Sequence, residues 1–240
     1  MPNSPNIMKR LVIFTGAGIS ADSGIRTFRD QDGLWANHRI EDVCTPEALL
    51  RNREQVIEFY NMRRKELLAS SPNEAHISLA QLEQYFHVEV ITQNIDDLHE
   101  RAGSTHITHL HGELRKLRSS RNEEALVPIE GWQQDLDARH PDGSLLRPHV
   151  VFFGENVPMY DVAVKKVQTA DIFVVIGTSL AVYPAAMLVR YVPTHVPIFV
   201  VDPGKPDLSL LNRPVECVVE RAAIGVPQLA TQLIERYSHV

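Results

Sequence analysis

Short apolar runs alternate with helical stretches along most of the chain. Runs of this kind, rich in β-branched residues and bounded by polar turns, are typical of strands buried on both faces of a parallel sheet. The most continuous of them, Ile172–Ile176, is expected near the centre of that sheet. The pattern predicts an α/β fold with a Rossmann-like parallel sheet. The expected strands are Lys9–Phe14, Val88–Ile91, His106–Leu110, Ile172–Ile176, Ile198–Val201 and Val215–Val219.

Three stretches have helical periodicity and recognisable ends. Thr45 is expected to cap the first of them. Ser71 is expected to cap the second, with Glu74 completing a capping box. Pro227 is placed in the first turn of the third, where a proline is tolerated. The expected helical stretches are 45–70, 72–83 and 227–237.

Two segments interrupt the alternation of strands and helices. One is the helical insertion, and the other is polar and has no clear periodicity. We expect the two insertions to form a small module of residues 39-85 and 112-149. The Rossmann-like sheet domain is then expected from residues 1-38, 86-111 and 150-240.

Composition narrows the class of protein. A chain of 240 residues with 44% hydrophobic residues can bury one core. A net charge of -6 argues against nucleic acid as a direct partner. The two cysteines, Cys44 and Cys217, fit a reducing compartment. Without a signal-like or membrane-length apolar run, we expect a cytoplasmic protein that does not bind membranes.

Polar or glycine-rich residues follow five of the expected strands. Ligands of open α/β sheets bind beyond the carboxyl ends of the strands, so these residues form the expected site. Each has a simpler interpretation: a tight structural turn, a helix cap or a surface imidazole. Their position at one sheet edge favours a ligand of dinucleotide size. The residues are Gly16, Ala17, Gly18 and Ser20, then Gln93, Asn94, Ile95 and Asp96, then His111, then Gly177, Thr178 and Ser179, and finally Asp202.

The loop after the first glycine-rich turn does not fit a conventional dehydrogenase. A dinucleotide-binding fold should carry an acidic residue at the end of a second strand about 20 residues later. The chain instead has a polar loop, residues 26–35, with Phe28 and Arg29 near its start. We expect this loop to close over the ligand, with arginines near phosphate and Phe28 against a flat ring. Hydride transfer has little need of such a loop.

Five segments together resemble the signature segments of the sirtuins, in the same order and over nearly the whole chain except 112–146. They read GAGISADSGIRTFR, TQNIDDLHERAG, LHG, RPHVVFFGE and GTSLAVYPA. Sirtuins are NAD-dependent protein lysine deacylases. The resemblance implies that NAD is consumed, with nicotinamide released and the acyl group moved to ADP-ribose. It implies acylated lysine side chains as partners; the oligomeric state stays open, with a monomer favoured.

The resemblance also implies roles for individual residues. His111 would be the general base for a ribose hydroxyl, which suits an imidazole. Gln93 and Asn94 would offer amides to the ribose and a water, and Asp96 would accept from the nicotinamide carboxamide, with Ile95 on the ring. The remaining contacts implied are Gly16, Ala17, Gly18, Ser20, Phe28 as a shield of the reacting carbon, Arg29 as an anchor of its loop, Gly177, Thr178, Ser179, and Asp202 in place of the asparagine often found there.

Two further sites are implied for the acylated protein. Val151, Phe153, Gly154 and Glu155 resemble an edge strand that pairs with the substrate backbone. Tyr60 and Arg63 lie three residues apart on an expected helix and therefore share a face. Their Y-x-x-R spacing resembles the subgroup that removes succinyl and malonyl groups, where this pair binds the acid end of the acyl chain. The simpler interpretation is a solvated helix face.

One feature departs from the family. Sirtuins usually hold a structural zinc with four cysteines in two C-x-x-C pairs, but the interval 112–149 has no cysteine. The pair His109 and His111 has strand spacing that could supply ligands, but His111 is needed for chemistry. We therefore expect no zinc. A small apolar core would stabilise the module instead, made of Leu117, Leu126, Val127, Ile129, Trp132, Leu136, Leu145 and Leu146.

Two alternative functions remain open on the same scaffold. One is a protein ADP-ribosyltransferase or NAD hydrolase, and the other is a non-catalytic NAD sensor. The presence of His111 and of the peptide-pairing segment 151–155 favours acyl transfer over both.

Overall fold

The computed structural model describes residues 8–27, 39–204, 206, 208–211 and 213–238. Its centre is a six-stranded sheet in the order β3-β2-β1-β7-β8-β9, in which every neighbouring pair is parallel. The order reverses between β1 and β7, which creates the crevice where ligands bind in such folds. The six expected strands are all present, with ends shifted by at most one residue. They are β1 (Arg10–Thr15), β2 (His87–Thr92), β3 (Ile107–His109), β7 (Ile172–Ile176), β8 (Ile198–Val201) and β9 (Glu216–Val218).

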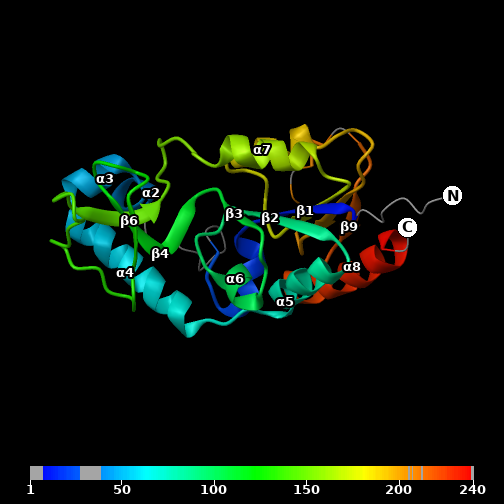
Figure 1. Ribbon diagram of the computed structural model, residues 1–240, viewed down its shortest axis with the longest axis horizontal. Coiled ribbons are helices and arrows are strands. Elements are labelled where there is room, and N and C mark those ends of the chain that lie inside the picture. Colours follow the sequence, from blue (N-terminus) through cyan, green and yellow to red (C-terminus); the bar gives the residue numbers. More distant parts are fainter. Residues whose placement is uncertain (1–7, 28–38, 205, 207, 212, 239–240) are drawn as a thin grey trace, which may run out of the picture.

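Helices cover both faces of this sheet (Figure 1). Successive strand residues point to opposite faces, so each buried strand contributes to two cores. On one face α5 (Glu74–Gln81), the 3₁₀ turn η2 (Leu82–Gln84) and α8 (Ala222–Tyr237) pack over Leu11 and Ile13. On the other face α7 (Tyr160–Gln168) and the 3₁₀ helix η3 (Ala185–Tyr191) pack over Val12 and Phe14. The short helix α6 (Leu98–Ala102) joins β2 to β3.

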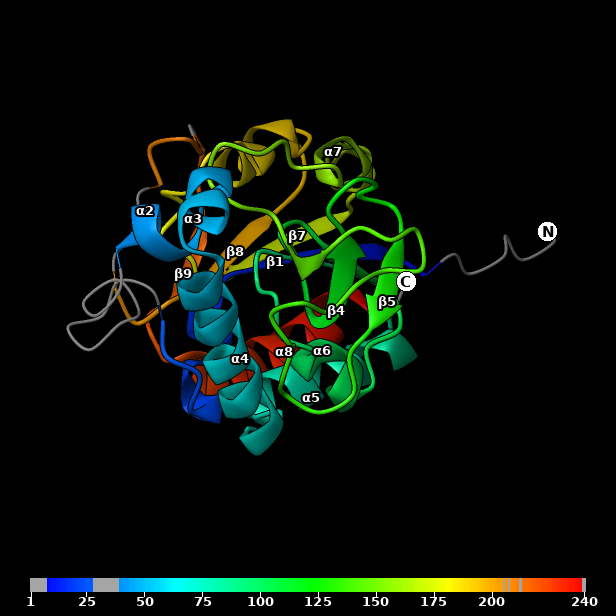
Figure 2. The same ribbon diagram turned by 90° about the vertical axis from the view of Figure 1, so that its left-hand side faces the viewer.

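A smaller module lies beyond the carboxyl ends of the parallel strands (Figures 1 and 2). It combines a three-stranded antiparallel sheet, in the order β5-β4-β6, with three helices. Gly112 begins β4 with φ +85°, and a Cβ there would lie 2.2 Å from the carbonyl oxygen of His149. The elements are α2 (Ile40–Val43), α3 (Pro46–Arg51), α4 (Arg53–Ala69), β4 (Gly112–Ser119), β5 (Leu126–Pro128) and β6 (Leu146–Val150).

The helical insertion is broken where the sequence predicts one long helix. Thr45 caps the first helix as expected, since its side chain accepts from the Ala48 N–H. The chain then leaves helical geometry at Asn52, which ends α3 and caps α4 by accepting from the Gln55 N–H. The prediction of an unbroken helix over 45–70 is therefore wrong, because an asparagine competes for backbone hydrogen bonds.

Two other predicted helix starts are also wrong. Asn73, not Ser71, caps α5, and the N3 partner in its capping box is His76 instead of Glu74. The last helix begins at Ala222, so Pro227 lies inside it. The five residues before the proline join the helix because Ala222 and Val226 are buried against the sheet.

The apolar core of the small module is smaller than the sequence predicts. Leu117, Ile129 and Leu146 form it, with Val127 and Ala138 packed against them. Four of the expected members are not part of this core: Leu126, Trp132 and Leu136 are each about 40% exposed (39%, 40% and 42%), and Leu145 is only partly buried.

Hydrogen bonds around a buried serine connect the rest of this module. The Ser119 hydroxyl lies 2.6 Å from an Asp142 carboxylate oxygen and 2.7 Å from the Ser144 hydroxyl. It also accepts from the Arg121 and Asn122 N–H groups at 3.1 Å. Asp142 in turn accepts from the Ser144 N–H at 2.8 Å. This serine cluster ties the end of β4 to the loop before β6, within the interval where the family usually holds zinc.

Helix α4 is fixed to the antiparallel sheet by a buried arginine. Arg64 donates to the backbone carbonyls of Leu114 at 2.8 Å and Trp132 at 2.6 Å, and to the Asn61 side chain at 2.7 Å. Burial lowers the pKa of Arg64 to about 10. These bonds hold the helix that carries Tyr60 and Arg63 in one position. Within the described residues, no helix combines the length and apolarity that crossing a membrane requires.

Candidate functional site

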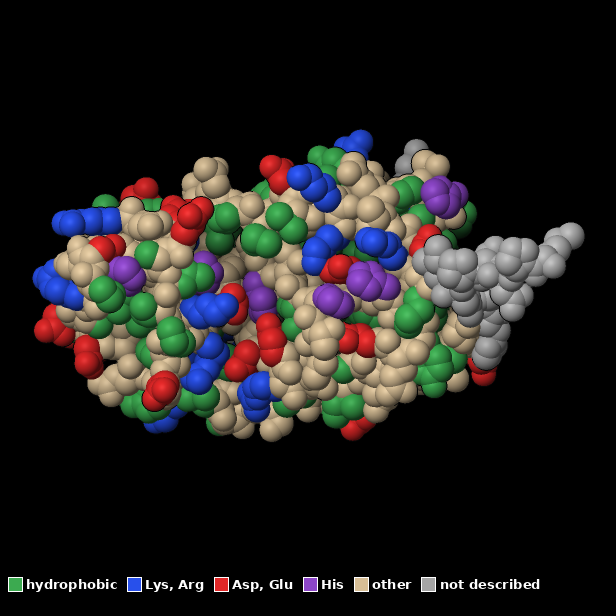
Figure 3. Space-filling view, viewed as in Figure 1, with side chains coloured by type: hydrophobic (Ala, Val, Ile, Leu, Met, Phe, Trp, Pro, Cys, Tyr) green, Lys and Arg blue, Asp and Glu red, His purple; other side chains and the backbone are tan. Residues whose placement is uncertain are grey.

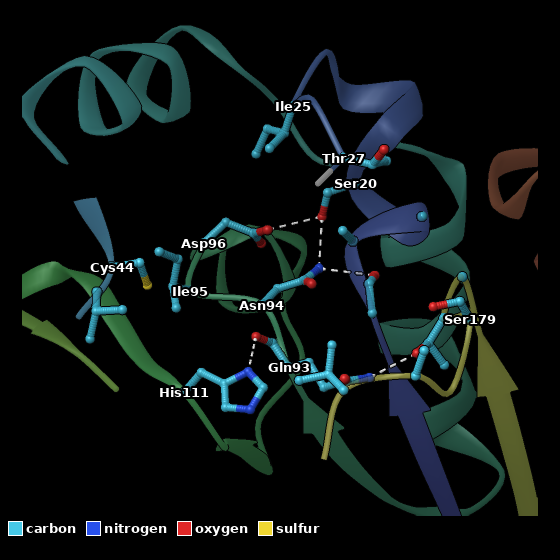
Figure 4. Close-up of a pocket in the computed structure, with 18 of the residues that line it drawn as sticks. Ser20, Ile25, Thr27, Cys44, Gln93, Asn94, Ile95, Asp96, His111 and Ser179 are labelled. Atoms are coloured by element: carbon cyan, nitrogen blue, oxygen red, sulfur yellow. Dashed lines mark hydrogen bonds between the residues drawn. The ribbon is translucent and has the colours of Figure 1, made fainter. Parts of the chain in front are cut away.

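A cavity of about 750 Å³ lies between the carboxyl ends of the parallel strands and the small module (Figure 4). Every predicted site residue that the structure describes lines it. Phe28 and Arg29 lie outside the described residues. Sequence reasoning missed several wall residues, including Ile25, Cys44 and Tyr183. Ile25 and Tyr183 lie within the quoted segments but were given no role of their own, and Cys44 reaches the cavity only through the fold.

Glycines at the ends of β1 and β7 form the floor of this cavity. The Gly16 N–H donates to the Ile176 carbonyl at 3.0 Å, and the Gly18 N–H donates to the Gly177 carbonyl at 2.9 Å. A Cβ on Gly18 would lie 2.7 Å from the Gly177 Cα. The two turns can approach this closely only because side chains are absent.

Polar side chains from β2 and the first turn meet above these glycines. The Asn94 amide donates to the Gly16 carbonyl and to the Ser20 hydroxyl, both at 3.2 Å. Ser20 donates to Asp96 at 3.0 Å, as the dashed lines in Figure 4 show. Burial raises the pKa of Asp96, while hydrogen bonds from the Leu98 N–H and Ser20 act against that rise. The chain therefore places a carboxylate and an amide, already oriented, in the cavity wall.

His111 lies directly beneath this group. Its Nδ1 faces the Gln93 carbonyl at 3.0 Å, and a carbonyl can only accept, so Nδ1 carries the proton. The Nε2 atom is then the acceptor of a neutral imidazole. Burial lowers the pKa of His111, which favours this neutral form. The Gln93 side chain turns away from His111 but also lines the cavity, where it donates to Thr178 at 3.0 Å. An oriented neutral imidazole in a cavity is suited to general base catalysis.

Tyr60 and Arg63 form the opposite wall and are not a solvated helix face. Their exposed fractions are 2% and 7%, and both line the cavity. The Tyr60 hydroxyl donates to the Cys44 sulfur at 3.3 Å. Burial is the main cause of a raised Tyr60 pKa and a lowered Arg63 pKa. Phe152 stacks on the Tyr60 ring with centroids 5.8 Å apart. A buried phenol and a buried guanidinium therefore line the same cavity.

The segment after β6 is a turn, so the expected strand over 151–155 is wrong. Glu155 folds back and accepts from the Phe152 N–H at 2.7 Å, from Arg147 at 2.6 Å and from Arg118 at 3.0 Å. Arg147 also lies 4.0 Å from the centroid of the Phe152 ring. These contacts stabilise a turn with Gly154 at φ +90° in place of an extended strand. The segment still lines the cavity.

Asp202 lies at the outer end of the cavity, after β8. It accepts from the Gly204 N–H at 2.8 Å. Half-burial raises its pKa. Its carboxylate is a hydrogen-bond acceptor for a hydroxyl-bearing ligand, as the asparagine oxygen would be, but it adds a negative charge.

Comparisons with known proteins agree with this geometry. A family model described as "Sir2 family" matches residues 16–184. The "NAD-dependent protein deacylase" of Bacteroides thetaiotaomicron is 50% identical over 95% of this chain and 99% of its own length. That of Aggregatibacter actinomycetemcomitans is 55% identical over 80% of this chain and 92% of its own.

Two solved structures have the same fold. A complex of a Sir2 homologue with NAD superposes with a TM-score of 0.86 at 37% identity, covering 96% of this chain and 91% of that one. A complex of Sir2 with a p53 peptide and NAD⁺ gives a TM-score of 0.76 at 31% identity, covering 95% and 93%.

Proposed function

Because this chain belongs to the Sir2 family and is an NAD-dependent protein deacylase, we propose that its cavity binds NAD and an acylated lysine together. The observation that carries this proposal is one cavity with two chemically different ends. The strand ends supply glycines, amides and His111, which suit a dinucleotide, while α4 supplies a buried phenol and guanidinium. Its volume of about 750 Å³ lies within the range of about 300–1,000 Å³ for small-molecule sites.

The residues present fit NAD at the sheet edge. Gly16 and Gly18 keep the floor open to a close approach, and the Gln93 and Asn94 amides face the ribose. Asp202 accepts from a hydroxyl at the outer end. NAD would supply the ADP-ribose that takes up the acyl group, with one water consumed and with nicotinamide and the free lysine released. The bent segment 151–155 binds the substrate peptide beside Val151 and Phe153.

His111 removes a proton from a ribose hydroxyl in this proposal. Its Nδ1–H stays bound to the Gln93 carbonyl, so only Nε2 can accept. Asp96 accepts from the nicotinamide carboxamide beside Ile95, and Asn94 holds the adjoining ribose. The substrate supplies the electrophilic carbon, and the protein supplies orientation and one base.

The sharpest test uses His111→Ala with NAD and an acyl-peptide panel, read by mass spectrometry. Loss of a positioned base should lower turnover by about 10²–10⁴-fold while the variant keeps its melting temperature. Near-native turnover would remove His111 from this role. O-acyl-ADP-ribose should accumulate in the wild type; an ADP-ribosylated protein in its place would support the alternative transferase activity, and free ADP-ribose alone would indicate an NAD hydrolase.

We also propose that Tyr60 and Arg63 select acyl groups that end in a carboxylate, such as succinyl and malonyl. A carboxylate there would accept from the Arg63 guanidinium, and from the Tyr60 hydroxyl once it turns from the Cys44 sulfur. The double variant Tyr60→Phe with Arg63→Met should lose at least about 100-fold on succinyl-lysine, since each of the two charged hydrogen bonds is worth about 1.5–3 kcal/mol, and largely keep acetyl-lysine. Equal losses of activity on both substrates would show that Tyr60 and Arg63 have a structural role and do not select the acyl group.

The organisation of the whole chain is a proposal of the same kind. We propose that residues 1-38, 86-111 and 150-240 act as the NAD-binding domain and residues 39-85 and 112-149 as the small module. We further propose a monomer in the cytoplasm, where free thiols such as Cys44 and Cys217 persist.

A further inference from the structure

Three successive carbonyl groups in the segment 93–95 accept hydrogen bonds from the segment 109–114. The first donor is the imidazole of His111, which lines the cavity, and the third is the backbone N–H of Leu114. The middle donor is a second imidazole, that of His109, which the sequence did not single out for this role. The pairs are Gln93 O with His111 Nδ1 at 3.0 Å, Asn94 O with His109 Nδ1 at 3.0 Å, and Ile95 O with Leu114 N at 2.7 Å.

His109 has an acceptor at each ring nitrogen. Nδ1 faces the Asn94 carbonyl, and Nε2 lies 2.7 Å from a Glu100 carboxylate oxygen. Neither partner can donate when Glu100 is ionised, so both nitrogens carry protons and the ring is an imidazolium. The side chain is 9% exposed, whereas Glu100 on α6 is 39% exposed. The charged ring of His109 therefore donates a hydrogen bond to the Asn94 carbonyl, and Glu100 covers the ring on its solvent side.

The surroundings of His109 favour this charge. Burial acts to lower its pKa, but the hydrogen bond and charge of Glu100 and the charge of Glu113 outweigh it, so the pKa is raised. Other ionisable groups act on it from the neighbouring elements: Asp96 before α6, His99 on α6 and His149 on β6, while Lys116 on β4 pairs with Glu113. Figure 3 shows charged side chains and histidines gathered on this face of the molecule.

Two imidazoles two residues apart are thus held in opposite protonation states. His111 has one carbonyl partner and a lowered pKa, which keeps Nε2 free to accept. His109 has a carbonyl and a carboxylate, which keep it charged. Two side chains of the same type can serve different roles when their surroundings separate their pKa values in this way.

We infer that His109, oriented by Glu100, is a positioning residue that fixes the Asn94 carbonyl and thereby presents the Asn94 and Asp96 side chains to the cavity. The inference rests on the proposed NAD site, because those two side chains act there. His109 itself touches neither NAD nor the acyl group. Its function is to hold the segment 93–96, whose only other hydrogen bonds to 109–114, among the described residues, are the two that flank it.

The same groups do not need a metal. Donor atoms of Glu100, His109 and Glu113 lie within 4.8 Å of one another. Each nevertheless has a partner in the protein: His109 pairs with Glu100, and Glu113 pairs with Lys116 at 2.8 Å. The arrangement is that of two neighbouring ion pairs.

The test is the pH profile of kcat/KM for NAD with three variants of the full chain. The wild-type profile should rise with pH as His111 becomes neutral and fall at higher pH as His109 loses its proton. Glu100→Gln should move the falling limb to lower pH, because the carboxylate that stabilises the imidazolium is gone. His109→Phe should lose about 10- to 100-fold, the value of a charged hydrogen bond. His109→Gln keeps a neutral donor and should recover part of that loss without the falling limb.

A second histidine–carboxylate pair supplies the matched control. His87 lies 3.3 Å from Glu89 at the start of β2, the end of that strand away from the cavity. His87→Gln should leave the profile unchanged. An unmoved falling limb in Glu100→Gln, or one that persists in His109→Gln, would overturn the inference. So would an activity loss that follows only the melting temperature, or a chelator that reproduces the effect of His109→Phe.

Failure of the proposed function would look different. It would leave the wild type without O-acyl-ADP-ribose product, or His111→Ala fully active, whatever the His109 variants do. If only the positioning role is wrong, the wild type is active, and the fall of kcat/KM at higher pH is the same in the His109 and Glu100 variants.

Discussion

A pair of buried histidines should make the fold sensitive to mild acid. His76 on α5 and His99 on α6 are both 0% exposed, and their ring centroids lie 5.0 Å apart. Each has one hydrogen-bonding neighbour, the Asn73 N–H for His76 at 3.4 Å and the Thr15 hydroxyl for His99 at 3.2 Å. The other nitrogen of each ring has no partner among the described residues. Within the part of the chain that the structure describes, neither imidazole has a carboxylate that would stabilise a positive charge.

The magnitude follows from the pKa difference between the folded and unfolded states. Burial lowers the pKa of His76 to about 4. An unfolded histidine has a pKa near 6.5, so the unfolded chain takes up protons first as the pH falls. Stability is therefore fully present above about pH 6.5 and declines toward pH 4. For His76 alone the loss at pH 5 is about 2 kcal/mol, a sizeable part of a typical 5–15 kcal/mol. His99, whose pKa is lowered by burial and by neighbouring histidines, adds in the same direction.

Urea unfolding at about pH 7.5 and pH 5 measures this directly. His76→Gln should be less stable than wild type at pH 7.5, but its loss between the two pH values should be smaller by about 2 kcal/mol. His195→Gln, which changes an exposed histidine, is the control. If His76→Gln loses as much stability as the wild type between pH 7.5 and pH 5, the buried imidazole is not the cause and the reasoning is refuted.

Three further outcomes are expected. Metal analysis of chelator-washed protein should find well under one zinc per chain, and chelators should leave the melting temperature unchanged; stoichiometric zinc coupled to folding would contradict this. Ser119→Ala should lower the free energy of unfolding by about 1–3 kcal/mol, because buried groups that bond to this hydroxyl lose their partner. Ser120→Ala, at the exposed neighbouring residue, should leave the free energy of unfolding unchanged. Gly112→Ala should be severely destabilised or fail to fold, because its Cβ would lie 2.2 Å from the His149 carbonyl oxygen; a stable, active Gly112→Ala would show that β4 and β6 can separate freely.

The sequence is most informative where burial alone decides the structure. The six parallel strands are confirmed because a continuous apolar run such as Ile172–Ile176 has few other ways to bury itself. Helix ends were predicted less well, because Asn52 and Asn73 cap by local hydrogen bonds that several nearby polar residues could have made. The local sequence alone does not show which of several neighbouring polar residues will cap the helix.

Site residues on strand ends could be predicted, but their mutual support could not. Tyr60 and Arg63 line the same cavity as the strand ends, although whether they bind an acyl chain is a prediction that the variants above test. The role of His109 depends on Glu100 and on a carbonyl fifteen positions earlier, which only the fold brings together. The same is true of Ser119 and Asp142, whose contact joins two segments of a module without regular periodicity.

The serine cluster makes the small module of this enzyme less sensitive to oxidation than a module held by cysteines. A module held by cysteine thiolates can be oxidised, and oxidation of metal-bound thiolates releases the ion. Hydroxyl and carboxylate groups at Ser119, Asp142 and Ser144 offer no such target. The chain has two thiols: Cys44 is buried and its pKa is raised by burial, whereas Cys217 is exposed on the outer strand β9, at the sheet's far edge. Oxidative stress that disables thiolate-held modules would therefore meet the one exposed thiol of this chain well away from His111.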